Sequence, residues 1–266
     1  MYHFNSRVSY SEVNSERTLT LPALLDYFQD CCIFQSEDLG VGVEHLDETK
    51  TAWVLSSWEI RLNRLPQMCE GIRICTWPYD FKGFYGYRNF TMEDEQGGVL
   101  ADANSVWIHM DMNTMRPVRI AEAMKEAYVP DISAGLEGNW APRKIAVPET
   151  GRMEKKEPVP VARFFIDTNH HMNNGKYVLV AEEYLPEDFP VRRLRVEYKK
   201  AAVFGDVLYP SVLTEENCVT VVLAEETGTP YAVVQFIGKE AQKTDGRKFL
   251  EFEKKAESRR SGMRET

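Results

Sequence analysis

The sequence lacks the features that mark several large classes of protein. It holds only five cysteines in 266 residues, and no two of them have the CxxC spacing of a redox or zinc motif. An odd and scattered set favours reduced thiols over a disulfide framework. No stretch is apolar enough to cross a bilayer, and the first residues show no basic segment followed by an apolar run. We therefore expect a cytoplasmic protein with no membrane segment, no bound metal and no cofactor.

Positive charge is also scarce. The chain has 41 acidic and 32 basic residues and a formal net charge of −9. Because nucleic-acid binders depend on neutralising phosphates, this balance argues against nucleic acid as a partner. The remaining composition, 43% hydrophobic and 27% charged, is that of an ordinary globular protein. The length allows one large domain or two of about 130 residues each.

The first half shows one helical pattern followed by strand patterns. Apolar residues recur at helical spacing between Thr20, a suitable N-cap, and Gly40, a suitable stop. From Thr51 onward apolar residues alternate, which puts Val54 and Trp58 on one face of a strand. Further strands are expected at residues 71–77, 83–92 and 99–111. The order predicts an amphipathic helix followed by an antiparallel meander.

The second half repeats this order after a segment rich in proline and charge. Residues 145–161 have no apolar period and read as a linker. A second helix is expected from Asn174 to Leu185, stopped by Pro186. Strands are then expected at residues 194–200, 207–214, 219–225 and 231–238. The predicted division is a first domain at 1–145, a linker at 146–160, and a second domain at 161–266 that ends in a charged tail from Lys239.

The densest group of polar side chains, Asp167–Tyr177 (DTNHHMNNGKY), joins an expected strand at 163–166 to the second helix. On an extended backbone Asp167, Asn169 and His171 would point to the same side. A carboxylate, an amide and an imidazole can together deprotonate water and stabilise an oxyanion. Segments of this composition also form ordinary turns and helix caps, so the residues alone leave catalysis and turn formation open.

The start of the second helix would add to such a site. Its first residues, Asn174 and Gly175, should have free backbone N–H groups at the positive end of the helix dipole. The oxygen of a substrate carbonyl could be held there. Elsewhere His109 lies in an expected strand without a second group of ligands, and we interpret it as a structural histidine.

The segment beginning at Asp167 resembles the D-x-N-x-H-x-N-N-x-x-Y signature of acyl-ACP thioesterases, the plant-type enzymes and bacterial relatives that release fatty acids from carrier protein. Three other segments agree. Tyr10–Phe34 resembles the family's first helix region. Ala103–Asp111, followed by Arg116–Ile120, resembles its strand that ends in W-x-x-M-D and R-P-x-R-I. Glu197–Lys200 resembles its E-Y-R/K-R/K strand. The resemblance runs from about residue 5 to about residue 240.

The resemblance implies an α+β fold of two tandem hot-dog domains, each an antiparallel sheet wrapped around a long helix. It transfers catalytic roles to Asp167, Asn169 and His171, with His170 on the opposite face. The first half would mainly shape the cavity for the acyl chain. Asp167, alone or with His171, would activate a water molecule, although direct attack by Asp167 through a mixed anhydride stays open. The products would be a free fatty acid and holo-acyl carrier protein.

Two adjacent positions depart from the family pattern. Ala201 and Ala202 stand where the plant-type enzymes usually carry Glu-Cys, which excludes a cysteine nucleophile there. Near them four cations gather in an otherwise acidic chain: Arg193, Arg195, Lys199 and Lys200. They form either a solvated sheet edge or a docking site for an acidic acyl carrier protein.

Three other functions compete with this interpretation. A hot-dog thioesterase can act on acyl-CoA, and a hot-dog dehydratase or hydratase also pairs an imidazole with a carboxylate on acyl thioesters. The D-x-N-x-H-x-N-N order disfavours the dehydratase. A non-catalytic acyl-binding protein is suggested only by Ala201 and Ala202. The sequence leaves the chain-length preference open, and the fold also allows a homodimer through a sheet edge.

Overall fold

The longest helix, α1 (Leu21–Asp38), forms where its caps and apolar period place it in the computed structural model, which describes residues 1–128 and 135–238. The Thr20 side chain accepts the backbone N–H of Ala23, which satisfies one of the unpaired donors of the first turn. Gly40 adopts a left-handed φ of 70° just beyond the helix, and its N–H donates to the carbonyl of Glu37. Both predicted ends of the helix are confirmed.

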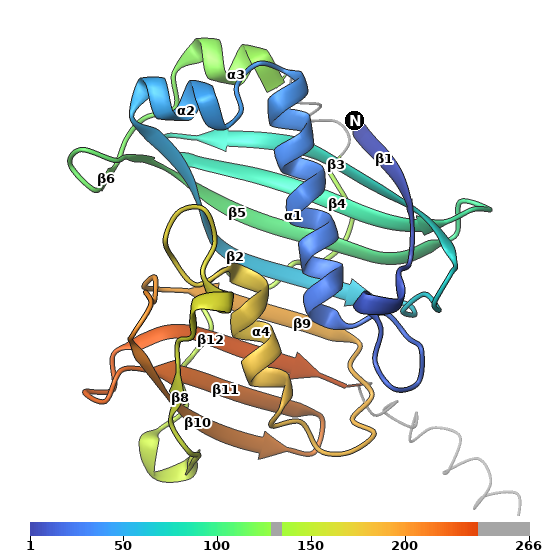
Figure 1. The fold of residues 1–266 in the computed structure, drawn as a ribbon, viewed down its shortest axis with the longest axis vertical. Helices are drawn as coiled ribbons and strands as arrows, with labels where there is room; N and C mark the ends of the chain where they lie inside the picture. Colours follow the sequence, from blue (N-terminus) through green and yellow to red (C-terminus); the bar gives the residue numbers. More distant parts are fainter. Residues whose placement is uncertain (129–134, 239–266) are drawn as a thin grey trace, which may run out of the picture.

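The first half builds its sheet from β1 (Tyr2–Arg7), β2 (Thr51–Leu62), β3 (Gly71–Lys82), β4 (Tyr85–Asp94), β5 (Val99–Asp111) and the short β6 (Arg116–Pro117). The short helices are η1 (Tyr10–Glu12), α2 (Val43–Thr49) and α3 (Glu122–Tyr128). The predicted strands are confirmed, although β3 continues five residues beyond the predicted end at residue 77, whereas β1 was missed because it is an edge strand that pairs only with β3. In Figure 1, α2 and α3 lie near the C-terminal end of α1.

The alternation predicted along β2 is wrong at its start. The register with β5 shifts between Leu55 and Ser57, so an extra residue is inserted and the strand bends. As a result Leu55 is 4% exposed, whereas Val54, expected on the core face, is 45% exposed. Beyond the shift the prediction is right, since the Trp58 ring packs against the Phe28 ring of α1 with centroids 5.9 Å apart.

The second half contains η3 (Thr150–Arg152), β7 (Glu154–Lys155), β8 (Val159–Pro160), η4 (Arg163–Phe165), α4 (Asn174–Glu182), β9 (Arg193–Tyr198), β10 (Val207–Glu215), β11 (Cys218–Ala224) and β12 (Pro230–Ile237). Two predictions need correction. The strand expected at 163–166 is a single 3-10 turn, η4, and the second helix ends three residues early, at Glu182. With nine residues α4 is half as long as α1, which has eighteen.

The two halves share one continuous sheet of twelve strands. Ten of them follow the order β1-β3-β4-β5-β2-β9-β12-β11-β10-β7, while β6 pairs with β5 and β8 with β10. The antiparallel junction between the halves is formed by β2 and β9. Helices α1 and α4 pack against each other on the same face of this sheet (Figure 1). Residues from both halves fill one apolar core between helices and sheet. Short pieces of the predicted linker, β7 and β8, pair with β10, and the domain limits themselves stay a prediction. The tail predicted from Lys239 lies outside the described residues.

Residues 135–145, here called the strap, cross the other face of the sheet. Three of their backbone N–H groups donate to buried polar side chains: Leu136 to Asn89 at 3.0 Å, Ala141 to Glu59 at 2.7 Å and Ile145 to Glu197 at 2.9 Å. These strand residues are almost fully buried. Since buried polar groups are costly without partners, the strap explains why amides and carboxylates are tolerated in the middle of β2, β4 and β9.

Candidate active site

Residues Asp167 to His171 form a tight turn. The Asp167 N–H donates to the carbonyl of His171 at 2.8 Å, and the His170 N–H donates to the carbonyl of Asp167 at 3.1 Å. The extended conformation expected for this segment is therefore wrong. The cause is local, because the Asp167 Oδ1 atom accepts the Asn169 N–H at 2.8 Å and so favours a turn, while His170 takes a left-handed φ of 61°.

The turn still brings Asp167 and His171 together. Ile166 and Met172 are bridged as an antiparallel pair directly outside it, so Asp167 and His171 face each other across the ribbon. Residues opposed in this way carry their side chains on one face. Asn169 lies at the exposed tip, next to His170. The residues predicted as catalytic are thus placed by a fold-back of the chain, and Asn169 stands apart from the other two.

The Asp167 carboxylate has one engaged oxygen and one open oxygen. Its Oδ1 atom accepts the N–H groups of Asn169 and, at 3.4 Å, of His171. Within the described ranges no hydrogen bond joins the side chains of Asp167, Asn169 and His171, and Oδ2 has no protein donor. Asp167 as a residue is half-buried, and its Oδ2 atom is left without a partner among the described residues.

The turn is attached to the chain segment that carries Ala201 and Ala202. The Met172 N–H donates to the carbonyl of Ala202 at 2.8 Å, and the Ala202 N–H donates to the hydroxyl of Tyr177 at 2.8 Å. Burial raises the pKa of Tyr177 to about 12, so this hydroxyl stays neutral. Ala202 is fully buried and Ala201 is exposed. The positions where the family resemblance predicts Glu-Cys thus lie beside the candidate catalytic turn.

The start of α4 differs from the prediction at Gly175. The Asn173 side chain caps the helix, and its Oδ1 atom accepts the Gly175 N–H at 2.8 Å. The backbone donor expected to be free at Gly175 is therefore already used. The N–H of Asn174 has no acceptor among the described residues, as is usual for the first position of a helix. Asn174 is the better placed of the two to hold an oxyanion.

Helix α1 of the first half reaches this same point, which the sequence did not reveal. The Asn174 side-chain Nδ2 donates to Oε1 of Gln29 at 3.2 Å, and a Cβ atom at Gly175 would lie 3.0 Å from Oδ1 of Asp26. Burial raises the pKa of Asp26. The positive charge of Lys176 lowers this pKa, and the negative charge of Glu12 raises it further. A signal was present, since residues 26, 29 and 30 put polar groups at i, i+3 and i+4 of an otherwise apolar helix.

The four cations predicted to dock a carrier protein all have partners within the chain. They are Arg193 with Glu59 (3.4 Å), Arg195 with the carbonyl of Pro142 (2.7 Å), Lys199 with Glu197 (2.9 Å), and Lys200 with Glu225. Arg193 and Arg195 lie on the face of β9 that is covered by the strap. The opposite face of β9 points toward α4, because Tyr198 on that face donates its hydroxyl to the Asn174 carbonyl. The geometry gives this docking site no support, and the role stays a prediction.

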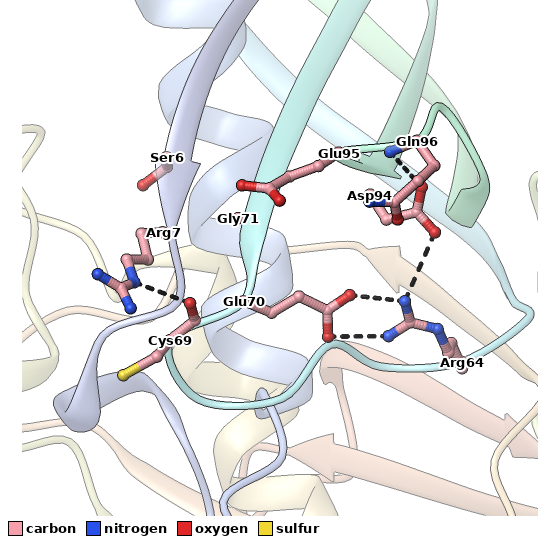
Figure 2. A pocket seen from close by; sticks show the side chains of 9 residues that line it. All are labelled: Ser6, Arg7, Arg64, Cys69, Glu70, Gly71, Asp94, Glu95 and Gln96. Atoms are coloured by element: carbon pink, nitrogen blue, oxygen red, sulfur yellow. Dashed lines mark hydrogen bonds and ion pairs between the residues drawn. The ribbon is translucent and has the colours of Figure 1, made fainter.

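A pocket of about 790 Å³ lies elsewhere, where β1, β3 and β4 meet (Figure 2). Arg64 fills one wall, donating to both oxygens of Glu70 and lying 3.6 Å from Asp94. The hydrogen bond from Arg64 lowers the pKa of Glu70. None of residues 167–175 lines this pocket. It is not part of the candidate active site.

His109 lies in β5, 5% exposed, with its ring 4.8 Å from that of Trp53. Burial lowers its pKa, so it is neutral at physiological pH. Across residues 1–128 and 135–238 no three His, Cys, Asp or Glu side chains are grouped as metal ligands. No helix in these ranges is long and apolar enough to span a bilayer.

The fold and the turn define a double hot-dog protein with a polar site where α4 begins. Known families agree with this class. The sequence pattern of the acyl-ACP thioesterase N-terminal domain matches residues 1–128, and that of the acyl-ACP thioesterase C-terminal domain matches residues 149–239. The chain belongs to the acyl-ACP thioesterase family, as its motifs predicted.

Individual relatives are distant. The acyl-(acyl-carrier-protein) hydrolase FATB3 of Cuphea viscosissima is 26% identical over 211 residues, 74% of this chain and 51% of that protein. The oleoyl-acyl carrier protein thioesterase 2 of Arabidopsis thaliana is 21% identical over 82% of this chain and 64% of its own length. The chain therefore spans about half the length of the Cuphea relative and under two thirds of the other.

Two solved structures show the same fold. An acyl-ACP thioesterase from Bacteroides thetaiotaomicron superposes with a TM-score of 0.80 at 23% identity, covering 89% of this chain and 97% of the other. The 12:0-ACP thioesterase from Umbellularia californica gives a TM-score of 0.76 at 15% identity, covering 90% and 96%. These likenesses confirm the predicted α+β double hot-dog fold.

Proposed function

We propose that this protein hydrolyses fatty acyl thioesters of acyl carrier protein, releasing a free fatty acid and holo-acyl carrier protein. The observation that carries the proposal is the pairing of Asp167 with His171 across a turn beside the free N–H of Asn174. Family membership supports the substrate class. Carboxylate, imidazole and helix-start donor are the groups that hydrolysis of a thioester requires.

In the proposed reaction, water held by Oδ2 of Asp167 attacks the thioester carbon. Its proton passes to the carboxylate, and the imidazole of His171 orients the water and shares the charge. The negative oxygen of the tetrahedral intermediate is held by the N–H of Asn174, with Asn169 approaching from the exposed tip of the turn. Collapse of the intermediate breaks the carbon–sulfur bond and expels the thiolate, which takes up the proton and leaves as a thiol.

Attack by Asp167 itself would instead form a mixed anhydride, which water then hydrolyses. The two routes differ under single turnover in isotopically labelled water. Direct water attack puts the label into the fatty acid alone, whereas hydrolysis of the anhydride at the Asp167 carbonyl puts it into the protein. Mass spectrometry of the peptide that contains Asp167 therefore separates them.

The function is tested by an assay of purified protein against acyl-ACPs of several chain lengths and the matching acyl-CoAs, with free thiol as the readout. We expect thiol release from saturated acyl-ACP. A dehydratase or hydratase would release none, and an acyl-binding protein would retain the ligand without turnover. Greater activity on acyl-CoA would identify the alternative thioesterase. A cytoplasmic location, a homodimer and carrier docking at Arg193, Arg195, Lys199 and Lys200 stay predictions.

A further inference from the structure

The geometry points to Gln29 of α1 as a positioning residue for the proposed thioesterase reaction, acting by holding Asn174 at the start of α4. The inference rests on the proposed function. The contact crosses the molecule, because Gln29 and Asn174 are 145 residues apart and belong to different halves. It gives the first half a part in the reaction beyond lining a cavity for the acyl chain.

Asn174 is held from two sides. Its side-chain Nδ2 donates to Oε1 of Gln29 at 3.2 Å, and its carbonyl oxygen accepts the hydroxyl of Tyr198 at 2.9 Å. Tyr198 is part of β9, so three separate segments meet at one residue. These two contacts limit rotation of the peptide unit that follows Asn174 and of its side chain.

What the two contacts leave unused is the backbone N–H of Asn174. As the first residue of α4 it has no acceptor within the helix, and the neighbouring Gly175 N–H is bound by the Asn173 side chain. This N–H lies at the positive end of the helix and three residues after His171. A donor that serves an oxyanion must be held in place before the reaction, since small displacements reduce its effect.

Because α4 is short, the Asn174 N–H can be held in place only with contacts from outside the helix. A helix of nine residues is marginal by itself, and its ends fray first. Apolar contacts through Tyr177, Val178 and Ala181 anchor its middle in the core. The first turn has polar contacts instead, with Gln29 at Asn174 and with Asp26 packed against Gly175. Gln29 therefore controls orientation at the end of the helix, while the core supplies stability.

The test compares Gln29→Leu, Asn174→Ala and the double variant on acyl-ACP and on a small acyl thioester without carrier. Leucine keeps the size of the side chain and removes the acceptor. We expect kcat to fall about tenfold in each single variant with KM little changed, as for the loss of one neutral hydrogen bond. The double variant should be no worse than Asn174→Ala alone, because Gln29 acts through Asn174.

The matched control is Gln67→Leu, which removes a glutamine hydrogen bond to Thr18 away from α4 and should leave kcat unchanged.

An unchanged kcat in Gln29→Leu, or losses that multiply in the double variant, would overturn the inference. So would a loss explained by a lower melting temperature alone. Hydrogen exchange of the Gly175 and Lys176 amides, which both donate to Asn173, keeps the inference testable without turnover, since Gln29→Leu should speed their exchange and Gln67→Leu should not. If the wild-type protein proves inert on every thioester, the proposed function fails. Unchanged hydrogen exchange in Gln29→Leu would show, independently of the activity assay, that Gln29 does not hold Asn174 in place.

Discussion

The hydroxyl of Tyr177 accepts the backbone N–H of Ala202 at 2.8 Å, and both residues are almost fully buried. Through this contact α4 holds the segment after β9, and the Ala202 carbonyl in turn accepts the N–H of Met172 at 2.8 Å. The candidate catalytic turn is therefore supported by a chain of two hydrogen bonds that begins inside the core.

Removal of the Tyr177 hydroxyl should destabilise the protein. Tyr177→Phe leaves the buried N–H of Ala202 without its acceptor, which costs about 1–3 kcal/mol. Urea unfolding measures the change, and Tyr10→Phe, at a position 85% exposed, serves as the control with no expected effect. Equal stability of the two variants would show that the hydroxyl contributes nothing.

Asp167→Asn and His171→Ala should each lower thioesterase turnover by about two to four orders of magnitude, the range of a positioned acid-base group. Asparagine can still accept the N–H of Asn169, so the turn should survive. His170→Ala is the control, because this exposed side chain lies outside the pair. Near wild-type kcat in either variant, with normal circular dichroism, would mean that the assigned site is wrong.

Ala201→Glu restores the carboxylate that the plant-type pattern has at this position. Because Ala201 is exposed beside the turn, the longer side chain can be accommodated. It could help to hold water, but its charge opposes the negative charge of Asp167. We expect a change in kcat below about tenfold, far smaller than the loss of an acid-base group. Wild-type protein that is inert while Ala201→Glu is active would show that the catalytic set is incomplete.

No cysteine should be acylated during turnover. Burial raises the pKa of Cys32 to about 11 and raises the pKa of Cys31, Cys75 and Cys218, so these thiols are poor nucleophiles. Cys69 is exposed in the pocket of Figure 2, away from the turn. Alkylation should therefore label Cys69 first and leave kcat intact. An acyl group found on any cysteine by mass spectrometry of quenched protein would contradict this account.

Glu182 should make the protein less stable as the pH rises. Burial raises its pKa from 4.5 to about 7, so the folded state holds a proton that the unfolded state has lost. The penalty is absent below pH 4.5, grows between pH 4.5 and about 7, and is complete above. Glu182→Gln should thus gain up to about 3 kcal/mol at pH 8 and little at pH 4. Urea unfolding at both values measures the difference, and a gain independent of pH would refute the assignment.

Much of the fold follows from local patterns in the sequence. The N-cap Thr20 and the stop near Gly40 bound α1 because capping chemistry acts within a few residues. Alternation located most strands, since their side chains repeat with period two. Even the turn at Asp167 is local, and its carboxylate favours a turn over the extended strand that we expected.

The sequence by itself determined the family and most of the order of helices and strands, and it led to the prediction of Asp167 and His171 as acid-base residues, because all of these depend on neighbouring positions. Only the tertiary structure decided that β2 and β9 join the halves into one sheet and that Gln29 meets Asn174. It also decided that Arg193 and Arg195 have partners within the chain, namely Glu59 and the carbonyl of Pro142. These contacts link residues far apart in the chain, and no periodicity or spacing encodes them.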